Sequence, residues 1–178
     1  SVYLQNIKEG RSVFGEINDI MPFSSEKTYT DLAAEIKKQW KQEKYPQAEI
    51  LPPYKSGKLY PDAQYFVLRA EGKIQAIANV EIQNDGCIWG RSLNTAPWNQ
   101  GKERIMKNSA KAVIARMVSF CLETGNDTLK FATDNPRNIA LYKSLGMKED
   151  GIRYFNGTPN TVLRFDKEDM EMYLKKFQ

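Results

Sequence analysis

A turn of small and basic residues comes immediately before the most strongly patterned helix of the sequence. Ser109 and Ala110 are small enough to let a ligand approach the backbone, and Asn108 tolerates the left-handed conformation of a tight turn. The first N–H groups of a helix lack partners within it, and its dipole adds positive potential, so such a turn can bind a phosphate. An ordinary solvated helix start fits the same residues equally well. The neighbouring cations are Lys102, Arg104, Lys107 and Lys111.

The sequence contains no histidine. This excludes Ser–His and Cys–His nucleophile systems, together with the commonest general base and the commonest transition-metal ligand. Carboxylates must therefore serve wherever a base is needed. Two cysteines are too few for a disulfide framework, and Cys121 lies on the apolar face of a helix, so we expect it in the core.

Composition and charge indicate one domain, residues 1–178, with enough apolar residues (41%) for a single core. A net charge of +4 is compatible with an anionic ligand or RNA but too small to require nucleic acid. The longest apolar run, 112–120, is far below the ~20 residues of a membrane span, and residues 1–10 do not resemble a secretory signal. We therefore predict a cytoplasmic protein without a membrane span, as a monomer or homodimer.

The elements that position the turn follow it in the sequence. Apolar residues at intervals of three and four predict a long helix that ends at Gly125. Thr128–Thr133 is β-prone and alternating, which predicts a strand. Asn135 can cap the next helix, Pro136 suits its first position, and Gly146 suits its end.

Three strands in an antiparallel meander are predicted upstream of the turn: Gln64–Ala70, Lys73–Gln83 and Cys87–Thr95. The middle strand alternates cleanly. One of its faces is apolar, and the other is either wet or lines a polar site. The polar residues of that face are Gln75, Asn79, Glu81 and Gln83.

The start of the chain is less regular. Val2–Ile7 alternates weakly and indicates an edge strand, whereas the apolar residues of Glu9–Met21 have roughly helical spacing. A narrow apolar stripe predicts a helix over Thr30–Lys44, and the stretch Pro46–Asp62, with four prolines and no periodicity, predicts a packed loop. The C-terminal part is predicted as two strands and a short amphipathic helix, Met147–Phe155, Thr161–Phe165 and Lys167–Gln178.

The segment Asn135–Met147, NPRNIALYKSLGM, resembles the fourth helix and following strand of the GCN5-related N-acetyltransferases, the GNAT superfamily. The order of predicted elements also resembles that of the family across nearly the whole chain. The resemblance implies an α/β protein of the α+β kind with the single-domain acyl-CoA N-acyltransferase fold. That fold has a mixed, mostly antiparallel sheet of about seven strands, about four flanking helices and, here, a short C-terminal helix. The alternative is an ordinary packing helix.

The resemblance implies acetyl-CoA as co-substrate and no metal. In the family, a glycine-rich turn before the long helix holds the pyrophosphate. Aligning KNSAKAVI with that turn puts Asn108 and Ala110 at glycine positions and Ile105 where Gln or Arg is usual, a departure for which Arg104 or Lys107 can compensate. The implied cofactor-binding residues are Leu93, Asn94, Thr95, Arg104, Lys107, Asn108, Ser109, Ala110, Lys111, Asn135 and Tyr142.

The chemistry implied is direct attack of an amine on the thioester, which needs a base for the ammonium proton and an acid for the departing thiolate. Tyr142 matches the tyrosine acid of the family, with a core tyrosine as the alternative. Glu81 is the candidate base, with an ordinary exposed strand glutamate as the alternative. Acceptor specificity is expected in Tyr29–Tyr60, where Pro46–Asp62 would form a wall or lid.

The acceptor amine stays open from sequence: a small molecule, a protein N-terminus or lysine, or an aminoacyl-tRNA. A degenerate member of the family that binds a partner and no CoA is a further alternative, because both glycines of the turn are missing. An RNA-binding adaptor is less favoured, because the sequence lacks a basic stretch interleaved with aromatic residues.

Overall fold

The computed structural model describes residues 2–40, 63–83 and 85–177. Within these ranges it contains nine strands, four α-helices and one short 3-10 helix. They form two compact units, the first from residues 1–79 and 92–114 and the second from 80–91 and 115–178. A single domain over the whole chain stays a prediction. No helix in the described ranges is long and apolar enough to cross a membrane, and the predicted loop Pro46–Asp62 lies outside them.

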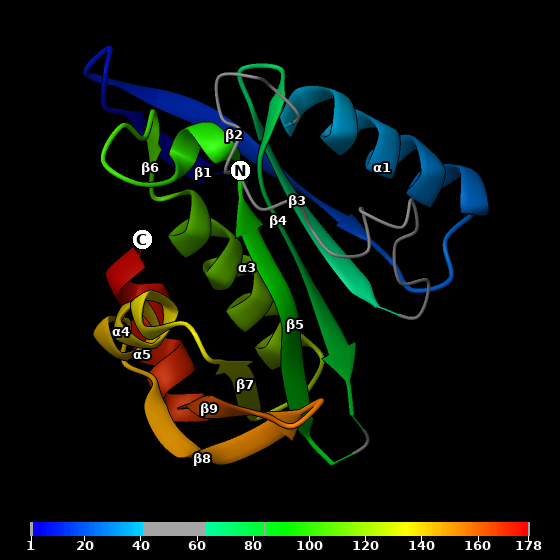
Figure 1. Cartoon of the computed structure of the whole chain (residues 1–178), viewed down its shortest axis with the longest axis vertical. Helices are drawn as coiled ribbons and strands as arrows, with labels where there is room; N and C mark the ends of the chain where they lie inside the picture. The colour runs from blue at the N-terminus through cyan, green and yellow to red at the C-terminus, as the bar shows by residue number, and fades with distance from the viewer. Residues whose placement is uncertain (1, 41–62, 84, 178) are drawn as a thin grey trace. The chain divides into compact units, whose positions relative to one another are not determined.

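The first unit contains a sheet with the strand order β6-β1-β2-β3-β4-β5 (Figure 1). Strand β1 pairs antiparallel with β2 and with β6, and β2 pairs antiparallel with β3. The elements that lie wholly or partly in this unit are β1 (Val2–Asn6), β2 (Arg11–Ile20), α1 (Glu26–Trp40), β3 (Gln64–Ala70), β4 (Lys73–Ile82), β5 (Cys87–Thr95), η1 (Pro97–Asn99), β6 (Met106–Lys107) and α3 (Ser109–Glu123).

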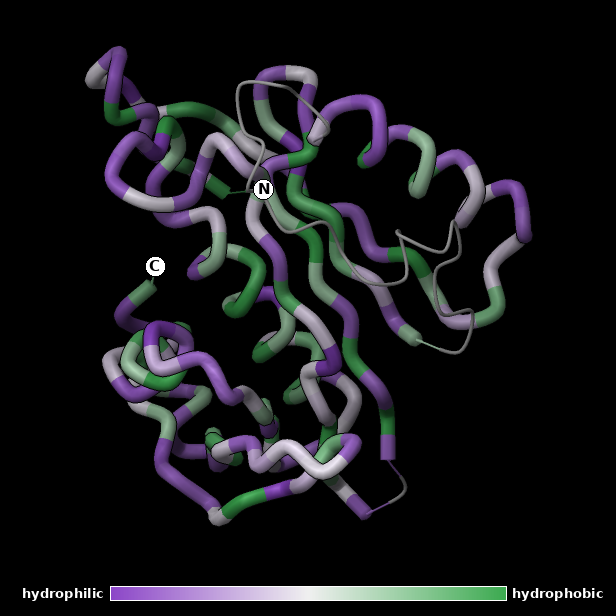
Figure 2. The backbone as a smooth tube through the Cα atoms, in the orientation of Figure 1, coloured by the Kyte–Doolittle hydropathy of each residue, from purple (hydrophilic) through white to green (hydrophobic). Residues whose placement is uncertain are grey.

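Helix α1 covers one face of this sheet with the narrow apolar stripe that the sequence predicts, while the rest of the helix is hydrophilic (Figure 2). Ile36 and Trp40 are closed to solvent in a cluster with Tyr65 and Ile77. The Trp40 indole N–H donates to the backbone oxygen of Ile74 at 3.0 Å. The core of the first unit therefore lies between α1 and strands β3 and β4.

The predicted helix Glu9–Met21 is wrong, because most of it is strand β2. Val13 and Gly15 point inward at alternate positions, and Phe14 lies on the outer face, where its ring contacts Tyr3 at 5.9 Å between centroids. Pairing with strands on both sides, together with the β-branched residues of this segment, outweighs a weak helical spacing.

Seven strands are predicted from the sequence, and the described ranges contain nine. The two additional strands are β2, which was predicted as a helix, and β6, whose two residues are too few for a periodic signal. Because β6 pairs with β1, the strand predicted at the edge of the sheet lies one place inside it. The predicted mixed and mostly antiparallel architecture is confirmed.

The second unit contains the strand order β5-β7-β9-β8 (Figure 1). Residues Cys87–Gly90 of β5 pair parallel with β7, and the remaining pairs of this group are antiparallel. Cys121 is closed to solvent, as predicted. The further elements of this unit are β7 (Thr128–Thr133), α4 (Pro136–Ser144), β8 (Lys148–Phe155), β9 (Thr158–Asp166) and α5 (Lys167–Phe177), all within three residues of the predicted bounds.

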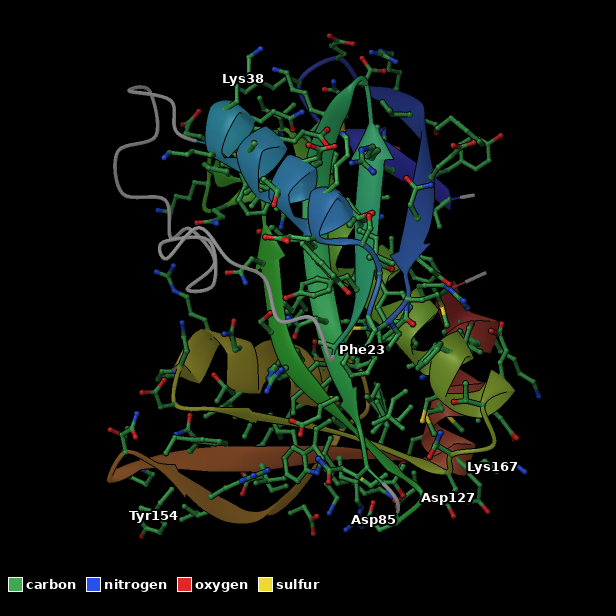
Figure 3. All side chains as sticks on the ribbon, turned by 90° about the vertical axis from the view of Figure 1, so that its right-hand side faces the viewer. Phe23, Lys38, Asp85, Asp127, Tyr154 and Lys167 are labelled. Atoms are coloured by element: carbon green, nitrogen blue, oxygen red, sulfur yellow. The ribbon has the colours of Figure 1, made fainter. Side chains whose placement is uncertain are left out.

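The turn signals of the sequence are confirmed at the backbone. Asn135 caps α4, because its side-chain oxygen accepts from the backbone N–H of Arg137 at 2.9 Å. At one end of the second unit, Asp85 and Asp127 lie close together (Figure 3), and the backbone N–H of Asp127 donates to the oxygen of Gly86 at 3.2 Å. Local residue chemistry thus sets the ends of these elements.

Candidate active site

The turn before α3 has the left-handed conformation that the sequence permits. Asn108 has a φ of +75°, and its backbone oxygen accepts from the N–H of Ala112 at 2.9 Å as α3 begins. Lys107, the last residue of β6, is exposed. An asparagine, the non-glycine residue that best tolerates positive φ, therefore forms this bend.

A buried amide, Asn99, fixes this turn to strand β4. Its Nδ2 donates to Oε1 of Gln75 at 2.8 Å and lies 3.5 Å from Oγ of Ser109. Its Oδ1 accepts from the backbone N–H of Met106 at 2.9 Å. Because Asn99 is only 8% exposed, these bonds hold the start of α3 in a site shielded from water.

Gln75 is the centre of the same network. Its Oε1 also accepts from the Trp98 indole N–H at 2.9 Å, and its Nε2 donates to the backbone oxygen of Ala70 at 2.9 Å. Its side chain is 1% exposed, so at this position the polar face of β4 is buried and not wet. Gln75 therefore connects β4 to Trp98 and Asn99 through buried hydrogen bonds.

The end of β5 is connected to this network. The backbone N–H of Ala96 donates to the backbone oxygen of Gln75 at 2.9 Å, and Nε2 of Gln100 donates to the backbone oxygen of Thr95 at 2.9 Å. Leu93, Asn94 and Thr95 are half-buried. The first unit thus contains both segments predicted to bind the cofactor, the strand end and the helix turn, joined through Gln75 and the residues after β5.

Tyr142 is a buried residue of α4 in the second unit, 6% exposed. Its ring stacks on Phe131 of β7, with 4.7 Å between centroids and 12° between planes. Burial raises the pKa of Tyr142 from 10.0 to about 12, and the phenol is protonated at neutral pH at either value. No described residue forms a hydrogen bond with its hydroxyl.

The glycine beneath this stack was not predicted to have a role. Gly90 of β5 is the strand partner of Phe131, and a Cβ atom on it would lie 2.1 Å from the Phe131 ring. The ring therefore lies directly over the β5 backbone, and Tyr142 lies on the ring. The signal in the sequence was a glycine inside a strand, which marks a close approach to the backbone.

Glu81, the predicted base, lies near the end of β4 in the second unit. Its side chain is 43% exposed, and Oε2 lies 3.9 Å from Nη2 of Arg91 on β5. The carboxylate is therefore open to solvent and placed by a neighbouring cation. This is compatible with a base and equally with an ordinary surface ion pair.

No protein-family model matches the sequence, and no curated protein matches it. Solved structures do match. A Desulfovibrio desulfuricans protein assigned to the GNAT family of acetyltransferases is 12% identical with a TM-score of 0.61, over 85% of this chain and 99% of that one.

A spermidine N-acetyltransferase chimera from Vibrio cholerae and hSSAT is 16% identical with a TM-score of 0.61, over 88% of this chain and 98% of that one. A Bacillus anthracis protein assigned as a streptothricin acetyltransferase, solved with acetyl coenzyme A, is 9% identical with a TM-score of 0.51, over 58% of this chain and 63% of that one. The chain has the GNAT fold. At these identities the likeness concerns the fold alone.

Within the GNAT fold of this chain, the predicted site residues fall into two groups. Tyr142, Asn135 and Glu81 lie in the second unit, and the others lie in the first. The oxygen of Asn135 is used by the cap of α4. Its part in cofactor binding, like the roles of Tyr142 and Glu81, stays a prediction.

Proposed function

We propose that this protein is an acetyl-CoA-dependent N-acetyltransferase that transfers the acetyl group to an amine. One observation carries the proposal: within a GNAT fold, the turn before α3 has a left-handed bend at Asn108, where the family has a glycine. The departure from the glycine pattern therefore does not remove the backbone shape that an anion needs.

The residues of the turn fit a pyrophosphate. The first N–H groups of α3, at Ser109, Ala110 and Lys111, belong to the part of a helix that has no internal partners. The side chain of Ala110 is small, and the exposed cations Arg104 and Lys107 lie just before the turn. Ile105 stands where the family usually has Gln or Arg and brings no polar group. Arg104 and Lys107 would supply the positive charge instead.

The chain's own residues would then move two protons. Glu81 takes a proton from the acceptor ammonium, directly or through water, so that the free amine attacks the thioester carbon. Tyr142 gives its proton to the sulfur as the carbon–sulfur bond breaks. The new amide nitrogen then loses its second proton to solvent and the phenolate regains one from solvent, which leaves a neutral acetamide, a neutral thiol and an intact phenol. A phenol suits the second task because it holds its proton at neutral pH until a thiolate forms beside it.

Calorimetric titration with acetyl-CoA tests the proposal. Ala110→Glu places a carboxylate against the pyrophosphate, so we expect affinity to fall by more than about tenfold. Ala110→Ser keeps a small side chain and should bind like the wild type. A glutamate in the first turn of a helix is favourable to folding, so a loss of binding would not reflect unfolding.

Unchanged affinity in Ala110→Glu would refute the assignment of the turn. A wild-type protein that does not bind acetyl-CoA at all would instead identify a degenerate GNAT fold that acts as a binding protein.

A further inference from the structure

Asn79 of β4 is a buried amide that lacks hydrogen-bond partners in the described part of the chain. None of its surface is exposed, and among the described residues neither Oδ1 nor Nδ2 has a hydrogen bond. Buried polar atoms in folded proteins nearly always have a partner, and an unpaired amide lowers stability. Such a group therefore needs an explanation, and a ligand that supplies both missing hydrogen bonds is one.

Two other buried carboxamides show how unusual this is. Every amide atom of Gln75 is bonded, and Gln64 of β3 donates from Nε2 to the backbone oxygen of Tyr65 at 3.1 Å, although its Oε1 is unpaired. In the described part of the chain, Asn79 is the buried carboxamide with both of its atoms unpaired.

The position of Asn79 along β4 assigns it to the side of the proposed base. Side chains two residues apart share a face of a strand, so Asn79 lies on the same face as Ile77 before it and Glu81 after it. Ile77 packs in the cluster that α1 covers. Because a base must face the amine from which it takes a proton, the proposed role of Glu81 puts the acceptor at the Glu81 end of this face.

We propose that Asn79 binds the acceptor, and that the acceptor is a primary amine with a neutral amide beside it, as in an amino-acid amide or a peptide N-terminus. This inference rests on the proposed transferase function. Asn79 presents one hydrogen-bond acceptor and one NH2 donor. A second ammonium on the substrate would satisfy only Oδ1, a carboxylate would satisfy only Nδ2, and an amide satisfies both.

Asn79 is closed to solvent in the free protein, so a neighbouring side chain must move as the ligand enters. The two hydrogen bonds that the amide gains offset that movement. The same reasoning predicts a trade-off between stability and function, because a group left unpaired for a ligand destabilises the free fold.

The test compares three matched amines in acetyl transfer: alaninamide, alanine, and the diamine in which the alaninamide carbonyl is reduced to a methylene. We expect kcat/KM for alaninamide to exceed the other two by at least about tenfold. Asn79→Leu should raise the melting temperature by about 2–4 °C, raise KM for alaninamide at least about tenfold and leave acetyl-CoA affinity unchanged. Gln64→Leu, a similar change at the neighbouring strand, should leave KM unchanged.

A stabilised Asn79→Leu variant with unchanged KM for alaninamide would overturn the inference, as would preference for the diamine or for alanine. If Asn79→Leu does not fold, Asn79→Ala replaces it with the same expectation for KM. Where the wild type shows no transfer, the proposed function fails, and calorimetric binding of alaninamide to the wild type and the variant still decides on Asn79. Equal binding, or none to either, would refute its role.

Discussion

Replacing Tyr142 by phenylalanine should change how stability depends on alkaline pH. The phenol is buried and has no hydrogen-bond partner among the described residues, and its pKa is raised from 10.0 to about 12 by burial. Below pH 10, Tyr142 is protonated in both the folded and unfolded chain, so its contribution is complete. Above pH 10 the unfolded chain ionises first, and stability is lost until the pH passes the folded-state pKa of about 12.

The size of the loss follows from the two pKa values. Each unit of difference corresponds to about 1.36 kcal/mol, so the wild type should lose about 1.4 kcal/mol at pH 11 through this residue and about 2.7 kcal/mol in the limit. The Tyr142→Phe variant has no phenol to ionise, so it should not lose this part of its stability. At pH 8 the two proteins should differ by less than about 1 kcal/mol, because the missing hydroxyl had no partner.

Urea unfolding followed by circular dichroism at pH 8, 10 and 11 measures this difference. Tyr154→Phe is the matched control, because Tyr154 is 68% exposed at the β8–β9 hairpin (Figure 3) and its surroundings change little on unfolding. Wild type and Tyr142→Phe with parallel pH profiles would refute the burial of the phenol.

Two further predictions concern the same stack. Tyr142→Phe should lower the turnover rate constant by roughly ten- to a thousandfold at unchanged acetyl-CoA affinity, measured by steady-state kinetics and calorimetry; unaffected turnover would make the tyrosine structural. Gly90→Ala should destabilise the fold by about 1–3 kcal/mol in urea unfolding, because the new Cβ would lie 2.1 Å from the Phe131 ring. The double variant Gly90→Ala, Phe131→Leu should recover part of that loss, and a neutral Gly90→Ala would contradict the close contact.

Local signals in the sequence predict most of the fold. Strands β3, β5 and β7 have their predicted bounds, because each is limited by turn residues with a specific backbone preference. The helix prediction failed for segment 11–20, because its apolar spacing fits a helix only weakly. The segment is a strand because it pairs with β1 and β3. The pairing with β3 joins residues that are about 45 to 55 positions apart in the sequence, as in Gly15 with Ala70 and Ile20 with Tyr65.

The candidate site is less accessible to such reasoning. The bend at Asn108 follows from residue type, and Tyr142 from a motif. Sequence does not predict the contact of Gly90 with Phe131 or the unpaired amide of Asn79. Each depends on which side chains meet after folding. Sequence shows only an unusual residue at each place, a glycine or an asparagine within a strand.

Before any ligand is present, Asn99 fixes the turn that we propose to bind a phosphate. With its amide bonded to Gln75 and Met106, the segment that leads into α3 has already lost its conformational freedom during folding. A flexible glycine-rich loop would lose that freedom on binding, at a cost in affinity. Asn108 acts in the same direction, because an asparagine at this bend allows the chain fewer conformations than a glycine would. Binding of an anion at this turn should therefore cost little conformational entropy. The hydrogen exchange rates of its backbone amides should change little when the anion binds.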